Sequence, residues 1–131
     1  MLELFSEDWI HLLKDLWNAS EDVSGKLAKI NFCATISCGF KNEESPRCLF
    51  VVKNGVATYA GVYHGETVDW DMRADRENWE QWAKKPLGLT AMGIAVATGK
   101  LQFKQGDFKR MLINPSMTGP FIKSFALMSH M

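Results

Sequence analysis

The stretch INFCATISCGF, residues 30–40, alternates between apolar and other side chains, and this alternation decides the class of fold. Its even positions are apolar, and its odd positions include Asn31, Thr35 and Ser37. A period of two residues is typical of a β-strand that has one face on a core and the other toward solvent. We therefore expect a strand over residues 30–40, in a sheet with one buried face.

Three further strand patterns follow this stretch, separated by turn residues. They are RCLFVV (47–52), VATYAGVY (56–63) and TVDWDMR (67–73). Asn54-Gly55 between the first two is a strong hairpin signal, and the next turn is HGE, residues 64–66. Short connections between consecutive strands predict that all four strands form an antiparallel meander.

Helical patterns flank these strands on both sides. Residues 6–20 predict a helix that Ser6 caps and whose apolar stripe includes Trp9 and Trp17, and EDVSGK (21–26) predicts a polar link. After the strands we expect a helix over 75–85, which Asp75 caps, and a helix over 87–98, which ends at Gly99. A fifth strand over 100–105 and a helix over 108–114, which Asp107 caps, should follow. Pro115 should break that helix, and a last helix should begin with Pro120 in its first turn. The pattern predicts an α+β fold: a five-stranded, mostly antiparallel sheet covered by helices, in one domain of residues 1–131.

The composition excludes several classes of protein. With 47% apolar and 23% charged residues, the 131-residue chain is typical of a globular protein. Lysine plus arginine equals aspartate plus glutamate, 15 each, so the total charge does not favour a nucleic-acid partner. Cys33, Cys38 and Cys48 have no C-x-x-C spacing and indicate reduced thiols. Because the acidic N-terminal residues do not have the pattern of a signal peptide, we expect a cytoplasmic protein.

The charges are unevenly distributed along the chain. From Lys84 to the end there are seven basic residues and one acidic residue, Asp107, so this part has a net charge of +6 and residues 1–83 have −6. An apolar and basic segment favours contact with an anionic membrane or with a partner enzyme. The alternative is a set of separate, solvated lysines.

The segment PLGLTAMGIAVATG, residues 86–99, contains no charge and many small side chains. It is shorter than the roughly 20 residues of a membrane-spanning helix. Because the expected helix over 87–98 is uncharged on all sides, we expect it to be buried or to face apolar material. Its small residues either let backbones pack closely or leave space for an apolar ligand. The residues alone leave both alternatives open.

Few residues have the types and spacing of a catalytic or metal site. Asp69 and Asp71 lie on one side of a predicted strand, where two carboxylates could share a proton or a metal. His64 could join Cys33 or Cys48 in a zinc site or a nucleophilic pair. Carboxylates on a solvent-facing strand and isolated histidines explain the same pattern without chemistry. We expect no cofactor and no metal, and keep a small enzyme using Asp69, Asp71 or His64 as an alternative.

One longer segment carries a family resemblance. In AVATGKLQFKQGD (95–107), a helix ends in Gly99-Lys100, a short amphipathic strand follows, and Gly106-Asp107 turns the chain into the next helix. Together with DWDMRADRENW (69–79), this order of motifs resembles the sterol carrier protein 2 (SCP2-like) domain family. Gln105 is one residue more than the usual spacing before the Gly-Asp turn, so we expect a bulge there.

The resemblance implies an apolar tunnel between the sheet and its helices. It implies non-catalytic binding or transfer of a lipid: a fatty acid, acyl-CoA, sterol or isoprenoid. The residues expected to line the tunnel are Trp79, Trp82, Leu89, Met92, Gly93, Val96, Phe103, Phe108, Leu112, Phe121, Phe125 and Met128. Lys100, Lys104 or Arg110 would hold an anionic head group at its mouth. An accessory module that presents lipid to a partner enzyme is the alternative function.

Overall fold

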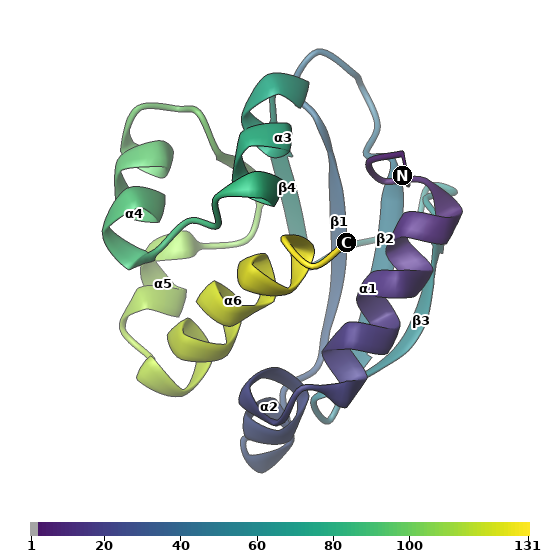
Figure 1. The fold of residues 1–131 in the computed structure, drawn as a ribbon, viewed down its shortest axis with the longest axis vertical. Coiled ribbons are helices and arrows are strands. Elements are labelled where there is room, and N and C mark those ends of the chain that lie inside the picture. Colours follow the sequence, from purple (N-terminus) through teal and green to yellow (C-terminus); the bar gives the residue numbers. More distant parts are fainter. Residues whose placement is uncertain (1–2) are drawn as a thin grey trace.

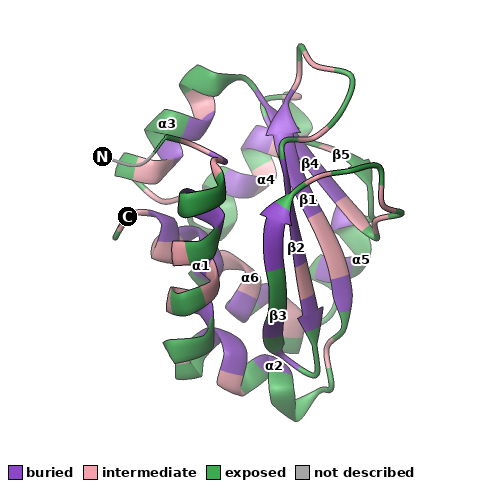
Figure 2. Cartoon of the chain, turned by 90° about the vertical axis from the view of Figure 1, so that its right-hand side faces the viewer, coloured by how far each residue is buried: buried purple, intermediate pink, exposed green. Residues whose placement is uncertain are grey.

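The computed structural model describes residues 3–131 and contains a five-stranded sheet with helices packed on one face (Figures 1 and 2). The strands are β1 (Ala34–Phe40), β2 (Cys48–Lys53), β3 (Val56–Val62), β4 (Trp70–Ala74) and β5 (Gln102–Gln105), in the order β3-β2-β1-β4-β5. The helices are α1 (Glu7–Ala19), η1 (Glu21–Gly25), α2 (Lys26–Lys29), α3 (Arg76–Lys84), α4 (Leu89–Ala97), α5 (Phe108–Leu112) and α6 (Pro115–Met128). The predicted α+β class and mostly antiparallel five-stranded sheet are confirmed.

The predicted four-strand meander is wrong, because β4 does not pair with β3. It pairs in parallel with β1 on the other side of the sheet, with Ile36 opposite Trp70 and Cys38 opposite Met72. Residues 63–69 connect β3 to β4. At roughly 3.3–3.6 Å per residue, this connection is long enough to return the chain along the sheet and across β2 and β1. The HGE turn lies within this longer crossing.

The N-terminal half departs from the predicted element boundaries in two places. Ser6 caps α1 as predicted, because its hydroxyl accepts a hydrogen bond from the backbone N–H of Trp9 at 3.2 Å. The predicted polar link after α1 is instead helical, as η1 and α2. The strand expected from residue 30 begins at Ala34, because Asn31 takes a left-handed backbone conformation (φ 52°) that turns the chain.

The C-terminal half confirms three local predictions and corrects three others, since Asp75 precedes α3 without a capping hydrogen bond from its side chain and both proline predictions change. Gly99 has the positive φ of a helix C-cap (78°), and Asp107 accepts a hydrogen bond from the backbone N–H of Arg110 at 3.2 Å. The expected bulge is present, since Asp71 pairs with Gln105 whereas the next residue, Met72, pairs with Phe103.

Pro115 starts α6 instead of breaking a helix, because proline suits the first helical position. Pro120 therefore lies inside α6.

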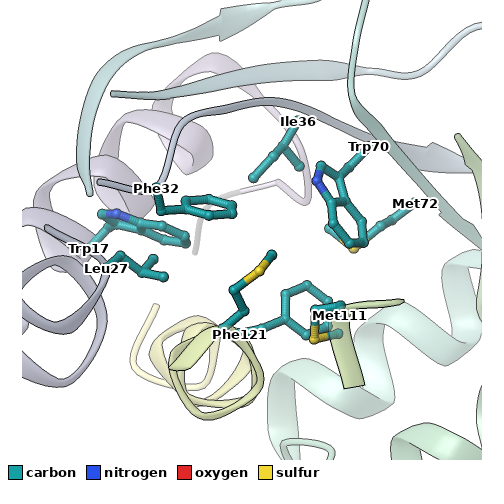
Figure 3. A pocket seen from close by; sticks show the side chains of 9 residues that line it. Trp17, Leu27, Phe32, Ile36, Trp70, Met72, Met111 and Phe121 are labelled. Atoms are coloured by element: carbon teal, nitrogen blue, oxygen red, sulfur yellow. The ribbon is translucent and has the colours of Figure 1, made fainter. Parts of the chain in front are cut away.

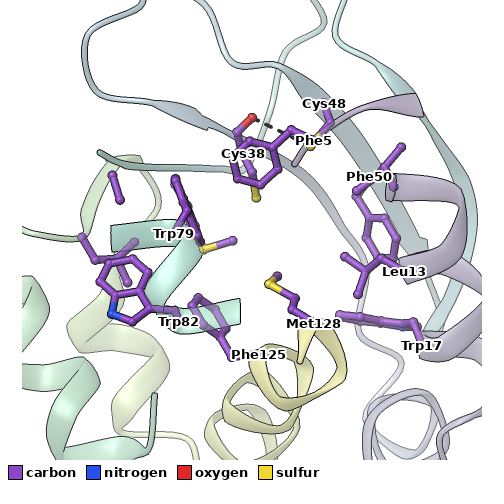
Figure 4. Close-up of a cluster of buried hydrophobic side chains, with 14 of the residues drawn as sticks. Phe5, Leu13, Trp17, Cys38, Cys48, Phe50, Trp79, Trp82, Phe125 and Met128 are labelled. Atoms are coloured by element: carbon purple, nitrogen blue, oxygen red, sulfur yellow. Dashed lines mark hydrogen bonds between the residues drawn. The ribbon is translucent and has the colours of Figure 1, made fainter. Parts of the chain in front are cut away.

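The core lies between the inner face of the sheet and helices α1, α3 and α6 (Figure 2). Figure 4 shows its aromatic part, in which Trp79 packs against Trp82, Phe125 and Phe5. The indole N–H groups of two buried tryptophans are satisfied by backbone carbonyls: Trp79 donates to Gly39 at 2.9 Å and Trp17 to Gly55 at 3.0 Å. These bonds fix the positions of α3 and α1 relative to the sheet.

Helix α4 is not buried within the chain, so the structure contradicts the first of the two alternatives expected for residues 87–98. Only Met92 and Ala95 of α4 are buried, whereas Leu89 and Ile94 are 51% and 59% exposed. A side chain added at Gly93 would meet no atom within 4 Å. The lack of charge therefore does not reflect burial within this chain. Among residues 3–131, no helix has the length and apolar character needed to cross a membrane.

Candidate functional site

The parallel pairing of β1 and β4 creates an apolar surface on the inner face of the sheet. Residues at i and i+2 of a strand point to the same side, and the register sets Ile36 beside Trp70 and Cys38 beside Met72. Trp70 and Met72 thus face the helix layer, whereas Asp71 and Arg73 point to the opposite face of the sheet. The inner surface at this place carries only apolar side chains.

A small cavity of about 30 Å³ lies between this surface and the helices (Figure 3). Its wall comes from the sheet, the N-terminal helices, and helices α5 and α6: Trp17, Leu27, Phe32, Ile36, Trp70, Met72, Met111, Met117 and Phe121. None of these side chains is charged, and the indole N–H of Trp17 is already bonded to Gly55. The cavity can therefore hold an apolar group, and its wall offers no ionisable acid or base.

The size of the cavity limits what it holds in this conformation. Ligand pockets usually have volumes of about 300–1,000 Å³, so the tunnel implied by the resemblance is not open at that size. Three of the wall residues, Met72, Met111 and Met117, are methionines, whose unbranched side chains repack easily. Two of them lie on α5 and α6 rather than in the sheet, which makes this side of the wall the adaptable one.

An open groove on the surface lies next to the cavity, since Trp70, Met111 and Met117 line both. Its rim carries Arg110, Asp69 and Asp107. The carboxylate of Asp69 accepts a hydrogen bond from the backbone N–H of Thr35 at 2.8 Å, and that of Asp107 caps α5. Within residues 3–131, the Arg110 side chain has no carboxylate within 4.0 Å. Arg110 therefore keeps its charge available at the mouth of the groove.

The residues considered for an enzyme do not converge on a site. Asp71 is buried and ion-paired with Arg73, at 2.7 Å from Oδ1 to Nε and 3.1 Å from Oδ2 to Nη2, whereas Asp69 is exposed and bound to Thr35. The expectation that both carboxylates face solvent together is wrong, because the Asp71 side chain is only 11% exposed beside the buried Arg73 guanidinium. His64 is exposed on the loop before β4, and its backbone N–H donates to Glu66. In the described part of the chain, no three His, Cys, Asp or Glu side chains are grouped as metal ligands.

Cys38 gives no activated nucleophile either. Cys38 and Cys48 lie opposite each other on β1 and β2 and are both buried. The hydrogen bond with the Cys48 thiol, together with burial, raises the pKa of Cys38 well above its usual value. Cys38 is therefore a protonated thiol, whereas the thiolate is the nucleophilic form. Cys33 is exposed, and its sulfur accepts a hydrogen bond from the backbone N–H of Asn54.

Comparisons with solved structures identify the arrangement of sheet and helices. A crystal structure of sterol carrier protein 2 superimposes with a TM-score of 0.75, at 17% sequence identity, covering 97% of this chain and 98% of the other. A candidate sterol carrier protein from Thermus thermophilus gives a TM-score of 0.67 at 18% identity, covering 98% and 92%. This chain has the sterol carrier protein 2 fold.

A third similar structure with this SCP2 fold is described as the UbiJ-SCP2 ubiquinone synthesis protein. Its TM-score is 0.59 at 11% identity, and the match covers 93% of this chain and 88% of that one. No protein-family model matches the sequence, and no curated protein matches it significantly. At such low identities the likeness establishes the fold and leaves the ligand open.

The SCP2-like structure places the residues predicted to line a tunnel in four different environments. Phe121 lines the cavity. Val96, Phe103 and Phe108 line a separate open groove beside Lys104, between α4 and β5. The packed core contains Trp79, Trp82, Met92, Phe125 and Met128, whereas Leu89 and Leu112 are exposed and Gly93 borders open space. The structure thus brings together only some of these residues, and their role in binding a ligand stays a prediction.

Sequence reasoning missed the other eight residues of the cavity wall. Ile36, Trp70 and Met72 carried a usable signal, because the alternation of their strands placed them on apolar faces. What was missing was the pairing of β1 with β4, which brings them together. Of the three cations expected at the mouth, Arg110 lies on the groove next to the cavity, Lys104 lines the other groove, and Lys100 lines neither.

Proposed function

We propose that this protein binds an apolar lipid ligand between the sheet and helices α5 and α6, without catalysing a reaction. The observation that carries the proposal is the cavity wall, which consists only of apolar side chains and shares three of them with a groove open to solvent. Each methylene group that such a site removes from water contributes about 0.8 kcal/mol to binding. Affinity would then come from the length and volume of the tail.

Ligand entry requires the cavity to expand, and the wall indicates where. Met111 on the short helix α5 and Met117 on α6 line both the groove and the cavity, and Phe121 of α6 lines the cavity. Rotation of the two methionine side chains, with a small outward shift of α6, would join the two spaces. The sheet side, formed by Ile36, Trp70 and Met72, would stay in place because the strand ladder holds it.

The mouth of the groove supports an amphipathic ligand. Arg110 can donate to a carboxylate or phosphate head, while Met117 and Trp70 contact the first part of its tail. Fatty acids, acyl-CoA, sterols and isoprenoids all have a polar end and an apolar body. The likeness to a structure described as sterol carrier protein 2 supports a sterol as one member of this range.

Presentation of the bound lipid to a partner enzyme is a second candidate function. The observation that favours it is the similarity to the UbiJ-SCP2 ubiquinone synthesis protein. In that case the ligand would be an isoprenoid, and the protein would act as an accessory factor. Both functions share the same cavity, and they differ in whether a second protein receives the ligand.

The proposal predicts saturable uptake of a lipid by the delipidated protein. Titration with fluorescent fatty-acid, sterol and isoprenoid probes should give a dissociation constant in the micromolar range or below for at least one class. Native mass spectrometry of the protein as purified should detect a bound lipid that is lost under denaturing conditions. If none of the three probe classes binds saturably, the proposed function is wrong.

A further inference from the structure

We propose that the surface formed by α4 and the end of α5 docks on an anionic lipid bilayer. This docking face is defined by its four protruding aliphatic side chains: Leu89 and Ile94 on α4, and Leu112 and Ile113 at the end of α5. Helices α4 and α5 lie together on the side of the molecule away from α1 (Figure 1), where Val96 and Ala97 of α4 share a groove with Phe108 of α5.

The docking face exposes large aliphatic side chains, as β3 also does at Val56 (44%) and Val62 (42%). Leu89 is 51% exposed, Ile94 59%, Leu112 38% and Ile113 81%. The solvent side of α4 carries no charged residue, since its other exposed positions are alanine and threonine. A surface helix normally keeps charged residues on its outer face. Only Met92 and Ala95 of α4 are buried in the core. Packing within this chain therefore does not require apolar side chains at the exposed positions of α4, although Leu89 and Ile94 are apolar.

The charges around the docking face point to an anionic partner. Lys84 and Lys85 precede α4, Lys100 follows it, and Lys109 and Arg110 precede the two exposed residues of α5. Among the described residues, none of these five cations has a carboxylate within 4.0 Å. Asp107, the sole acidic residue after Lys84, is occupied in capping α5. Aliphatic side chains framed by unpaired cations complement a bilayer surface, whose phosphates lie above an apolar layer.

A lipid surface fits this face better than a protein partner does. The residues that dominate protein–protein interfaces are mainly tryptophan, tyrosine and arginine, and α4 contains neither tryptophan nor tyrosine. Leucine, isoleucine, alanine and threonine offer little directional recognition. They suit partial insertion below the head groups, where lysines can reach the phosphates through their flexible stems.

Docking by this face would bring the mouth of the groove to the bilayer. Ile113 and Arg110, which lie at the end of α5, also line the groove next to the cavity. A lipid could then pass from the membrane into the protein without crossing water. This last step rests on the proposed ligand binding, whereas docking itself does not, because α4 does not line the cavity.

Co-sedimentation of the whole protein with vesicles tests the proposal. We expect binding to vesicles of phosphatidylcholine mixed with phosphatidylglycerol, weakening as the salt concentration rises, and little binding to phosphatidylcholine alone. The single variants Lys84→Gln, Lys85→Gln and Lys100→Gln should each lower the coefficient for partition of the protein onto these vesicles about fivefold. Ile94→Ser and Ile113→Ser should each lower it up to about tenfold, because an exposed aliphatic side chain no longer enters the bilayer.

Val56→Ser is the control, since Val56 is also an exposed aliphatic residue, at 44%, but lies on β3. It should leave vesicle binding unchanged. The proposal is overturned if the mixed vesicles are not bound, if neutral vesicles bind equally well, or if Val56→Ser weakens binding as much as Ile94→Ser. It is also overturned if Ile94→Ser instead dissolves a dimer seen by analytical ultracentrifugation. Uptake of a soluble fluorescent lipid should be unchanged in the Ile94→Ser variant, so failure of docking and failure of ligand binding are separate results.

Discussion

Replacing Arg73 by methionine is expected to lower the free energy of unfolding by about 3–5 kcal/mol, the cost of leaving one partner of a buried ion pair alone. The Arg73 side chain is 1% exposed, and that of Asp71 is 11% exposed. Without the guanidinium, the Asp71 carboxylate would remain largely buried with no cation to stabilise it. Denaturant unfolding followed by circular dichroism would measure the change.

The effect is large because Arg73 also fixes the loop between β1 and β2. Its guanidinium donates to the backbone carbonyls of Phe40 at 3.2 Å, Glu43 at 2.8 Å and Glu44 at 3.3 Å. Each carbonyl that becomes buried without a donor costs free energy of its own. The loop should therefore loosen in the variant, and its amide hydrogens should exchange faster.

The exposed pair formed by Arg47 and Glu43 supplies the control. The side chain of Arg47 is 44% exposed, so Arg47→Met should change the free energy of unfolding by less than about 1 kcal/mol. The double variant Asp71→Leu, Arg73→Met should be more stable than Arg73→Met alone, because it no longer buries a single charge. Equal destabilisation by Arg73→Met and Arg47→Met would contradict the structural role given to Arg73.

Local features of this chain could be predicted from the sequence because neighbouring residues determine them. Ser6 and Asp107 cap helices as expected, Gly99 ends one, and the alternation over residues 34–40 gives the correct inner face of β1. Each of these depends on side chains within a few positions of one another. The class of fold followed from adding such local patterns together.

The candidate site could not be predicted in the same way, because it depends on a long-range pairing. Ile36 and Trp70 are separated by 34 positions and meet only because β4 crosses to the far side of β1. The connection of residues 63–69 permits a return across the sheet as well as a hairpin, and no local residue distinguishes the two. Because the predicted meander paired β4 with the wrong strand, it did not bring the residues of the cavity wall together. The individual strands were largely predicted correctly.

The outer face of β4 and the outer face of α4 both differ from an expectation, for opposite reasons. Charged Asp71 and Arg73 were expected in solvent but are buried and paired with each other. Burial was one of the two alternatives expected for the uncharged α4, which is largely exposed. Polarity indicates which environment a side chain tolerates, whereas the partner that covers it is set by the rest of the molecule. Residues whose environment differs from the one that their polarity predicts are often functional or structurally important.

Replacing Met117 by tryptophan is expected to reduce lipid uptake at least about tenfold. Met117 lines both the groove and the cavity, and it is half-buried, so a larger ring can enter the space without displacing the strands. Filling the space of two methylene groups of a tail removes about 1.6 kcal/mol of apolar burial, which corresponds to a change of roughly tenfold in the dissociation constant. Titration of the delipidated variant with the probe that binds the parent protein most tightly measures the effect.

Gly93→Leu is the matched control for this experiment. Position 93 also lies in an apolar segment and also gains a large side chain, but that side chain would project into open space rather than into the cavity. Uptake should therefore be unchanged in Gly93→Leu and reduced in Met117→Trp, while both variants keep the circular dichroism spectrum of the parent. The opposite order, with Gly93→Leu blocking uptake and Met117→Trp leaving it intact, would move the ligand from the inner face of the sheet to the surface of α4, where the bilayer contact is proposed.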